Sequence, residues 1–240
     1  WKLKETLNLD YPADKMEVLV LSDASTDRTD AIVKSFADPR VRLVRPQHRL
    51  GKTGVQNFGV SQARGEVLFF SDATTHYHRM ALRFMASNYI DPRVGAVGGR
   101  NMYFDATGSP TGAGTIAFWN YENQVKCNQS RIHTITGCSG SIYSVRKSVY
   151  TALPDDIISD LVQPLMVVRQ GYRVIFEDRA IGYEDTTHTT REEFRMRVRV
   201  ITRGMRGLLS VPDLLNPLKR PWIALQLLSH KVLRWLAPFE

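Results

Sequence analysis

Two short apolar runs, each followed at once by an acidic residue, constrain the fold of this chain more than any other feature. Residues 17–22 (EVLVLS) precede Asp23, and residues 66–71 (EVLFFS) precede Asp72. Runs of this length and composition are typical of strands that a sheet buries on both faces. Ligands bind beyond the carboxyl ends of strands in open parallel sheets. Two acids at equivalent strand ends therefore predict a shared crevice for a cation or a donor-rich ligand.

Predicted strands and helices alternate along the chain, which indicates an α/β fold. We expect strands at 17–22, 41–45, 66–71 and 94–98, separated by helices that run from Thr26 or Asp27 to about Ala37, over 53–63 and over 78–89. This alternation implies crossover units and a largely parallel, Rossmann-like sheet flanked by helices. Farther along, we expect strands at 100–105, 141–146 and 173–177 and helices at 115–128, 160–170, 191–209 and 221–236.

Composition places the chain among ordinary globular proteins and shows where its charge lies. Of 240 residues, 43% are hydrophobic and 23% charged, which excludes disorder and collagen-like repeats. The net charge is +8, but residues 191–240 hold ten Lys and Arg against four acids. The sequence has no run of 18 apolar residues, so no bilayer-spanning helix is predicted. Cys127 and Cys138 lack metal-ligand spacing and indicate a reducing compartment.

Gly51-Lys52 resembles the end of a phosphate-binding P-loop, but the rest of that motif is missing. A P-loop requires another glycine five residues before its Gly-Lys pair, and Pro46 stands there. The nucleotide-triphosphatase interpretation is therefore excluded. Lys52 opens a predicted helix, where it either meets a phosphate or is solvated.

Several other polar residues have both a structural and a functional interpretation. Asp160 opens a predicted helix, where an acid commonly caps the N-terminus. Asp27 is interpreted as a turn residue, and His76 and His78 as surface histidines rather than metal ligands. The helix over 191–209 carries six arginines, which form a solvated face, a membrane-facing strip or a clamp for a diphosphate.

The order of these motifs resembles that of glycosyltransferase family 2, whose members are inverting, nucleotide-sugar-dependent enzymes with a GT-A fold. The motifs are Ser-Asp-Ala-Ser-Thr-Asp at 22–27, Gly-Lys before a helix with Asn57, and Phe-Phe-Ser-Asp-Ala-Thr at 69–74. Gly-Cys-Ser-Gly-Ser at 137–141, Ile-Ser-Asp-Leu at 158–161 and Phe-Arg-Met-Arg-Val at 194–198 follow the order of the cellulose- and chitin-synthase-like branch. The resemblance covers roughly residues 7–209.

The resemblance implies a role for each matching residue. Asp23 would contact the uracil or ribose, and Lys52 and Asp72 would complete the nucleotide site. Asp72 would hold Mg2+ or Mn2+ on the diphosphate, and Asp160 would be the catalytic base. Arg195 and Arg197 would contact the diphosphate or the acceptor.

The chain departs from the family pattern at four side chains and at its start. Ser22 and Thr74 stand where the family has acids, and Phe194 and Val198 replace a Gln and a Trp. The family's first strand is not found in residues 1–12, which resemble the end of the helix that follows it. We therefore expect a fragment in which residues 1–209 form a GT-A domain without its first strand and residues 210–240 form an amphipathic helical tail.

The expected function is transfer of a hexose or N-acetylhexosamine from a nucleotide sugar, with UDP favoured, to a saccharide or lipid-linked acceptor. The tail, with Trp222 and Trp235 beside Lys and Arg, suits an interfacial helix. Membrane attachment would place the parent protein at the cytoplasmic face of the cell membrane.

Three other functions compete with this one. A nucleic-acid-binding module would explain the basic tail but not the acids at the strand ends, so nucleic acid is not expected as a partner. A nucleotidyltransferase would need a Gly-rich loop near its start, which this sequence lacks. A catalytically impaired nucleotide-sugar-binding protein stays open because of Ser22 and Thr74.

Overall fold

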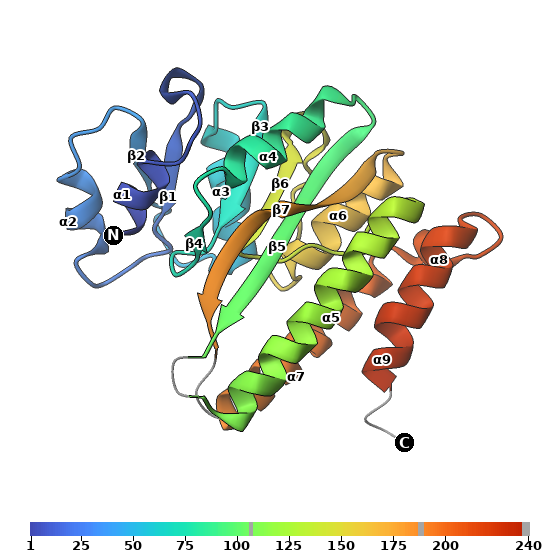
Figure 1. Ribbon diagram of the computed structural model, residues 1–240. Helices are drawn as coiled ribbons and strands as arrows, with labels where there is room; N and C mark the ends of the chain where they lie inside the picture. Colours follow the sequence, from blue (N-terminus) through green and yellow to red (C-terminus); the bar gives the residue numbers. More distant parts are fainter. Residues whose placement is uncertain (106–107, 187–189, 237–240) are drawn as a thin grey trace.

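A five-stranded sheet runs through the centre of the computed structural model, which describes residues 1–105, 108–186 and 190–236 (Figure 1). Its strand order is β3 (Val67–Ser71), β6 (Ile142–Arg146), β5 (Val94–Phe104), β7 (Arg173–Asp185) and β4 (His76–Tyr77). The longest ladder, between β5 and β7, is parallel, whereas β6 pairs antiparallel with both neighbours and β4 antiparallel with β7. The α/β class is confirmed, with antiparallel pairs beside the parallel one.

A separate parallel pair, β1 (Val18–Leu21) and β2 (Val41–Val44), lies beside this sheet. Helices α1 (Lys2–Leu7), α2 (Thr29–Lys34) and α3 (Gly51–Gln62) belong to the same N-terminal part of the chain. Asp27 accepts a hydrogen bond from the backbone N–H of Thr29 (3.0 Å), which confirms its interpretation as a turn residue. Strand β1, helix α2 and strand β2 form a crossover unit with parallel strands, as the sequence predicts.

A cavity of about 620 Å³ separates β1 from β3. Glu17, just before β1, accepts hydrogen bonds from the backbone N–H groups of Arg64 and Gly65, just before β3 (2.5 and 3.2 Å). The carboxyl ends of both strands meet the start of α3, so the two strands run in the same direction. The lining is mainly apolar and includes Leu19, Leu21, Val67 and Phe69 from the two facing strands. Within the described residues, no strand hydrogen bond joins the two sheets across this space.

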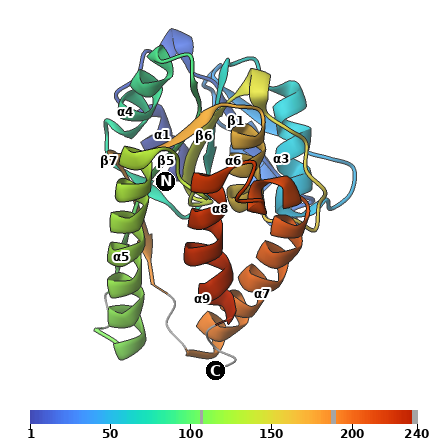
Figure 2. The same cartoon turned by 90° about the vertical axis from the view of Figure 1, so that its right-hand side faces the viewer.

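The remaining helices cover the central sheet and extend below it (Figures 1 and 2). They are α4 (Ala81–Ser87), α5 (Pro110–Ile132), α6 (Ser159–Arg169), α7 (Thr190–Leu209), α8 (Pro221–Leu227), a π-helical turn (Leu228–Val232) and α9 (Leu233–Leu236). The hydroxyl of Ser109 accepts a hydrogen bond from the N–H of Gly112 (2.9 Å), so α5 begins earlier than predicted. The predicted strands 94–98 and 100–105 form one strand, β5, because its parallel pairing with β7 continues past a bulge at Gly99.

The C-terminal helices pack onto the main core with one face and expose the other. Leu227 and Trp235 lie in the same buried cluster as Leu161 and Val162 of α6. Trp235 is only 8% exposed and lies against Gly204 of α7, so its expected role as a membrane anchor is wrong. Trp222 is 60% exposed. The boundary at residue 210 stays a prediction, and residues 237–240 at the end of the tail lie outside the described residues.

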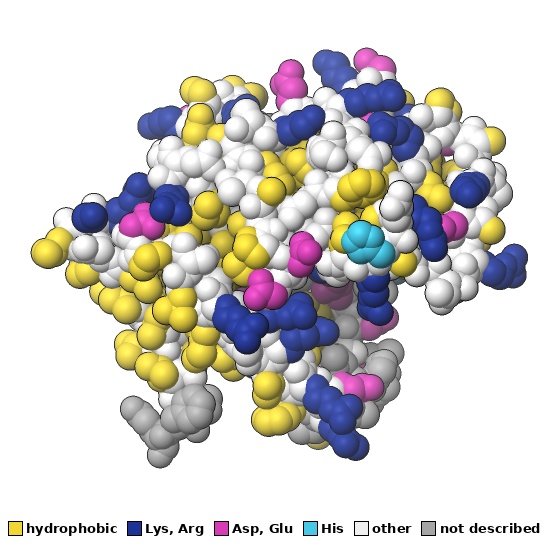
Figure 3. All heavy atoms as spheres, turned by 180° about the vertical axis from the view of Figure 1, so that it is seen from behind, with side chains coloured by type: hydrophobic (Ala, Val, Ile, Leu, Met, Phe, Trp, Pro, Cys, Tyr) yellow, Lys and Arg dark blue, Asp and Glu magenta, His cyan; other side chains and the backbone are white. Residues whose placement is uncertain are grey.

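Hydrophobic side chains gather over α8 and α9 on the molecular surface, beside a group of Lys and Arg side chains (Figure 3). The exposed members of this apolar surface are Trp222, Leu225, Leu228, Leu233 and Leu236. Among the helices of the described ranges, none has the length and apolar character that crossing a bilayer requires.

Gly99 is expected to be essential for packing of the central sheet. A Cβ added there would lie 2.6 Å from Ile142 and 2.8 Å from the carbonyl oxygen of Ala180, which cannot rotate away. Gly99→Ala should therefore lower the free energy of unfolding by about 1–3 kcal/mol in urea titrations.

Gly114→Ala is the matched control, because a Cβ at this exposed position of α5 meets nothing within 4 Å. Removing a helical glycine there should raise stability by roughly 0.5–1 kcal/mol. Equal effects of the two substitutions would contradict the packing described at Gly99.

Candidate functional site

The N-terminal end of α3 receives the acid that follows β1. Asp23 accepts hydrogen bonds from the backbone N–H groups of Leu50 (2.7 Å) and Gly51 (2.8 Å), one on each carboxylate oxygen. Gly51 has φ of +78°, a conformation that glycine adopts without strain. The pair of bonds satisfies backbone donors that a helix start would otherwise leave open. Asp23 thus fixes where α3 begins, and hence where Lys52 points.

Lys52 connects this helix end to the acid that follows β3. Its ammonium lies 2.5 Å from Oδ1 of Asp72, and both side chains are partly exposed. The carboxyl ends of β1 and β3 therefore meet at one edge, as the sequence predicts. Thr74, which replaces the second acid of the family motif, is exposed two residues farther on.

Asp160 lies in the first turn of α6, which begins at Ser159 after the N-cap residue Ile158. The N-cap residue is Ile158, so the structural interpretation of Asp160 as the N-cap is wrong. Pro164, four residues on, has no N–H to donate to the Asp160 carbonyl. That carbonyl instead accepts a hydrogen bond from the N–H of Cys138 (2.9 Å). The proline thereby allows α6 to hold the glycine-rich segment 137–141.

The side chains of Asp160 and Lys52 both approach the backbone at Gly140. A Cβ at Gly140 would lie 2.8 Å from Oδ2 of Asp160 and 3.1 Å from the Lys52 ammonium. Only a residue without a side chain leaves both groups where they are. The sequence motif that contains Gly140 thus forms one wall of the site, and the structure gathers Lys52, Asp72 and Asp160 around it.

The electrostatic surroundings of Asp160 suit a proton acceptor. Burial raises the pKa of its carboxyl above the usual value of 3.8. The charges of Lys52 and Lys126 oppose that rise, and the charge of Asp72 adds to it. Such a shift, by burial and charge together, is typical of functional carboxylates.

The two arginines expected at the diphosphate or the acceptor lie on α7. Arg197 donates to Glu193 (2.7 Å), and its guanidinium lies 5.0 Å from the ring centre of Phe118 on α5. Arg195 is exposed. Neither has a hydrogen bond or ion pair with Lys52, Asp72 or Asp160 within residues 1–105, 108–186 and 190–236, so their roles stay predictions.

Glu184 was not predicted, although it lies close to this site. It accepts hydrogen bonds from Thr75 (2.7 Å) and from the hydroxyl of Tyr103 (2.9 Å). The negative charges of both Glu184 and Asp72 act on Lys2 and on Tyr103. The predicted strand stopped at residue 177, whereas β7 continues to Asp185 and carries Glu184 to the site. A signal was present, because acids follow the apolar run 180–183 as they follow the two earlier strands.

The histidines near Asp72 are engaged elsewhere. His76 stacks on Trp1 with ring centres 4.0 Å apart and lies 3.2 Å from Glu5. His78 accepts a hydrogen bond from the backbone N–H of Met80 (3.3 Å). Ser22, where the family has an acid, donates to Asp30 (2.5 Å).

The donor set fits a cation that a phosphorylated ligand shares with the protein. Within the described ranges, His, Cys, Asp and Glu side chains form no group of three or more that could hold a metal ion. Asp72 offers one partly exposed carboxylate, with its charge partly balanced by Lys52. Mg2+ is typically held by one or two carboxylates together with substrate phosphates and water. Asp72 therefore suits this shared mode of binding and not an all-protein cage.

The acids that follow β1 and β3 thus lie beside the start of α3, which carries Lys52. The family model of Glycosyl transferase family 2 matches residues 2–153. The chain therefore belongs to glycosyl transferase family 2.

Relatives in sequence agree with this assignment. "Probable glycosyltransferase YdaM" of Bacillus subtilis is 28% identical over 211 residues, which cover 82% of this chain and 50% of YdaM. A Rhizobium meliloti "N-acetylglucosaminyltransferase" is 24% identical over 245 residues, covering 93% of this chain and 56% of that protein. The chain thus spans about half the length of the curated relatives it matches.

Solved structures show the same fold. The mannosyltransferase PcManGT from Pyrobaculum calidifontis, in complex with GDP-Man and Mn2+, superposes with a TM-score of 0.80 at 22% identity. The match covers 99% of this chain and 67% of PcManGT. S. aureus TarS in complex with UDP-GlcNAc gives a TM-score of 0.54 at 18% identity over 78% of this chain and 54% of that one.

The raised pKa of Asp160 predicts that this carboxylate lowers stability at neutral pH. The folded chain binds its proton more tightly than the unfolded chain, so stability falls as pH rises from about 4 through the folded pKa. Asp160→Asn should therefore raise the melting temperature at pH 7.5, and the gain should vanish near pH 4.

Asp156→Asn is the control for that measurement, because Asp156 is exposed and its contact with Arg206 is a surface ion pair (3.6 Å). Its melting temperature should equal that of the unmodified chain at both pH values. If Asp160→Asn melts at a lower temperature than the unmodified chain at pH 7.5, the carboxylate is held by favourable contacts and the predicted sign is wrong.

Proposed function

We propose that this chain is the catalytic part of an inverting glycosyltransferase that moves a hexose or N-acetylhexosamine from a nucleotide sugar to a hydroxyl. The observation that carries the proposal is the position of the half-buried Asp160 beside Lys52, which in turn contacts Asp72. One carboxylate base and a separate cationic site for the leaving diphosphate are what a single displacement needs.

The donor binds at the edge where β1 and β3 end. Asp23 faces the base or ribose, and Lys52 exchanges its contact with Asp72 for the diphosphate. Asp72 would hold Mg2+ or Mn2+, which neutralises charge on the departing nucleoside diphosphate. PcManGT with GDP-Man and Mn2+ and TarS with UDP-GlcNAc support a nucleotide-sugar donor, and we favour UDP.

Asp160 accepts the proton of the acceptor hydroxyl as that oxygen attacks the anomeric carbon. Attack comes from the face opposite the leaving group, so the configuration inverts in one step. This chemistry needs no second catalytic carboxylate, unlike retaining hydrolysis. Because its pKa is raised, the ionised carboxylate of Asp160 is a better proton acceptor than that of an ordinary aspartate.

The acceptor is a saccharide or a lipid-linked saccharide, bound on the side where α5, α7 and the C-terminal helices meet. Arg195 and Arg197 are assigned to the diphosphate or acceptor on the strength of the motif alone. The exposed apolar surface of α8 and α9, including Trp222 and Leu225, supports contact with a membrane surface. We place the parent protein at the cytoplasmic face of the cell membrane.

Asp160→Asn should abolish sugar transfer while leaving donor binding within a few-fold. Loss of a catalytic base typically costs about 10²–10⁴-fold in rate. UDP-glucose, UDP-N-acetylglucosamine and GDP-mannose should each be titrated by calorimetry with Mn2+, and transfer measured by nucleotide release. Turnover like that of the unmodified chain would show that Asp160 is not the base, and the absence of Mn2+-dependent binding of any of the three would contradict the donor site.

Gly140→Ala tests whether the site has the geometry described. Its Cβ would displace the carboxylate of Asp160 and the ammonium of Lys52, and misplacement by 1 Å can cost about 100-fold in rate. Gly137→Ala is the neighbouring control, because its Cβ would lie 3.3 Å from the flexible end of Leu161. Transfer should fall sharply in the first variant only.

A further inference from the structure

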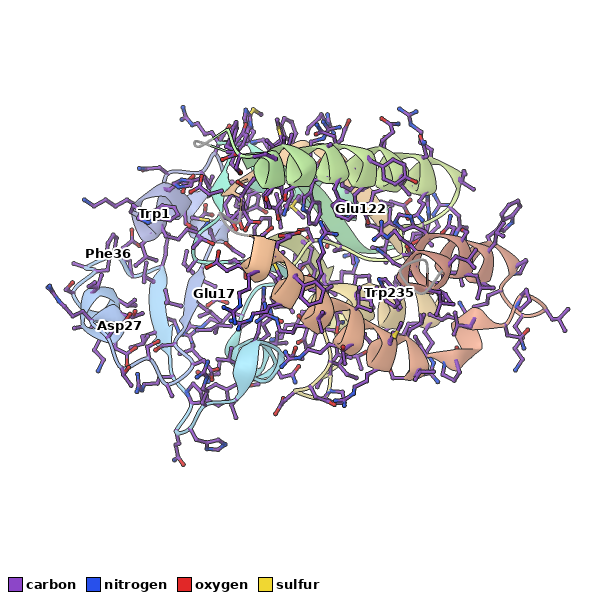
Figure 4. All side chains as sticks on the ribbon, turned by 90° about the horizontal axis from the view of Figure 1, so that it is seen from below. Trp1, Glu17, Asp27, Phe36, Glu122 and Trp235 are labelled. Atoms are coloured by element: carbon purple, nitrogen blue, oxygen red, sulfur yellow. The ribbon has the colours of Figure 1, made fainter. Side chains whose placement is uncertain are left out.

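A buried carboxylate, Glu122 of α5, lies at the centre of a group of basic side chains that the site above does not use. Its Oε1 contacts His230 (3.1 Å) and Lys231 (3.3 Å), and its Oε2 accepts from Arg234 (2.7 Å). Figure 4 shows Glu122 between α5 and the C-terminal helices. We call Lys126, His230, Lys231 and Arg234 the basic cluster.

The basic cluster carries more positive charge than the carboxylate inside it can balance. Lys126, one turn beyond Glu122, is 4% exposed and makes no hydrogen bond within the described parts of the chain. Its ammonium lies 5.2 Å from the ring centre of Trp119. Burial lowers the pKa of both Lys126 and Lys231, and repulsion from Arg234 adds to the fall. Three cations and a histidine around Glu122, with Asp160 as a second acid acting on Lys126, leave an excess of positive charge that is costly to bury without another anion.

Beyond Asp160, whose charge acts on Lys126, a further guanidinium lies beside the basic cluster. The guanidiniums of Arg197 and Arg234 both lie over the ring of Phe118, at 5.0 and 5.2 Å from its centre. Arg197 has Glu193 as its own partner. The π-helical turn Leu228–Val232 supplies His230 and Lys231. Such turns are rare and occur frequently at functional sites.

The basic cluster is next to Asp160. Lys126 and Asp160 each alter the pKa of the other, so the lysine is within electrostatic reach of both Glu122 and the proposed base. The cluster is formed by α5 and the C-terminal helices, whereas the donor residues Asp23, Lys52 and Asp72 lie at the strand ends around α3. The cluster is thus built from other elements than the donor site, on the side that the proposed function gives to the acceptor.

We propose that the basic cluster binds the phosphate group of a phosphorylated acceptor, with Lys126 and Arg234 as its principal contacts. A phosphate ester offers up to two negative charges and three acceptor oxygens, whereas a carboxylate offers one charge and two oxygens. The excess positive charge of the basic cluster matches the negative charge of a phosphate group. The guanidinium of Arg234 suits bidentate contact with phosphate oxygens. This inference rests on the proposed function, because it identifies the acceptor of that reaction.

The test measures binding of farnesyl phosphate, glycerol phosphate and inorganic phosphate by calorimetry, with farnesol as the uncharged comparison. Lys126→Met and Arg234→Met should each weaken binding of the phosphorylated probes at least tenfold and leave UDP binding with Mn2+ unchanged. Arg131→Met is the matched control, because Arg131 is an exposed arginine of the same helix. Preference for farnesyl phosphate over glycerol phosphate would identify a lipid-linked source, and equal binding a water-soluble one.

The Glu122→Gln variant tests whether the basic cluster binds phosphate or has a purely structural role. Removing the carboxylate that competes for the cations should tighten phosphate binding several-fold, even though it loosens the C-terminal helices and lowers the melting temperature. A structural cluster predicts lower stability with no change in phosphate binding, and that result would overturn the proposal.

Two further results would also overturn it. One is equal binding of farnesyl phosphate by the unmodified chain, Lys126→Met and Arg234→Met, where melting curves show that the variants fold. The other is competition between UDP and farnesyl phosphate, which would assign the cluster to the donor. If UDP fails to bind the unmodified chain while phosphate probes bind, the proposed donor site fails and the basic cluster stands.

Discussion

The start of α3 is the point on which the rest of the site depends. Asp23 accepts the backbone N–H groups that open the helix, and the next residue, Lys52, reaches across to Asp72. Lys52 also lies close to Gly140, where a side chain would meet both the Lys52 ammonium and the carboxylate of Asp160. One helix terminus thus sets the positions of three ionisable side chains from three separate segments. Charged groups held in this way need little rearrangement when a charged ligand arrives.

The elements that could be predicted from the sequence are those with a strong local pattern. The runs 17–22 and 66–71 each contain four consecutive apolar residues, and the acids that follow them meet at one edge as expected. Lys52, Asp72 and Asp160 could be singled out because each follows a strand or opens a helix. Antiparallel pairing of β6 could not be foreseen, since the direction of a short apolar strand leaves no periodic signal.

The pairing of buried charged side chains that lie far apart in the sequence could not be predicted, for a different reason. Glu122 and Lys126 are separated by one turn of a helix, where an acid and a lysine normally form a solvated surface pair. Their burial depends on residues more than a hundred positions away, including Lys231 and Arg234. Trp235 was assigned to a membrane contact on the same kind of local evidence, and its burial follows from Gly204, which no amphipathic pattern reveals.

The cavity between β1 and β3 has a consequence for how the molecule moves. In the part of the chain described, the β1–β2 pair has no strand hydrogen bond to the central sheet, and Glu17 and Asp23 tie its two ends to neighbouring backbone. Atoms that line an open space lack van der Waals partners on that side, so the two sheets stabilise each other little across it. Amide hydrogens of β1 and β2 should therefore exchange with solvent through a local opening that costs less than global unfolding, and earlier than those of β5 and β7. Since Asp23 lies on the part that opens and Asp72 on the part that stays, a nucleotide held by both would slow that exchange.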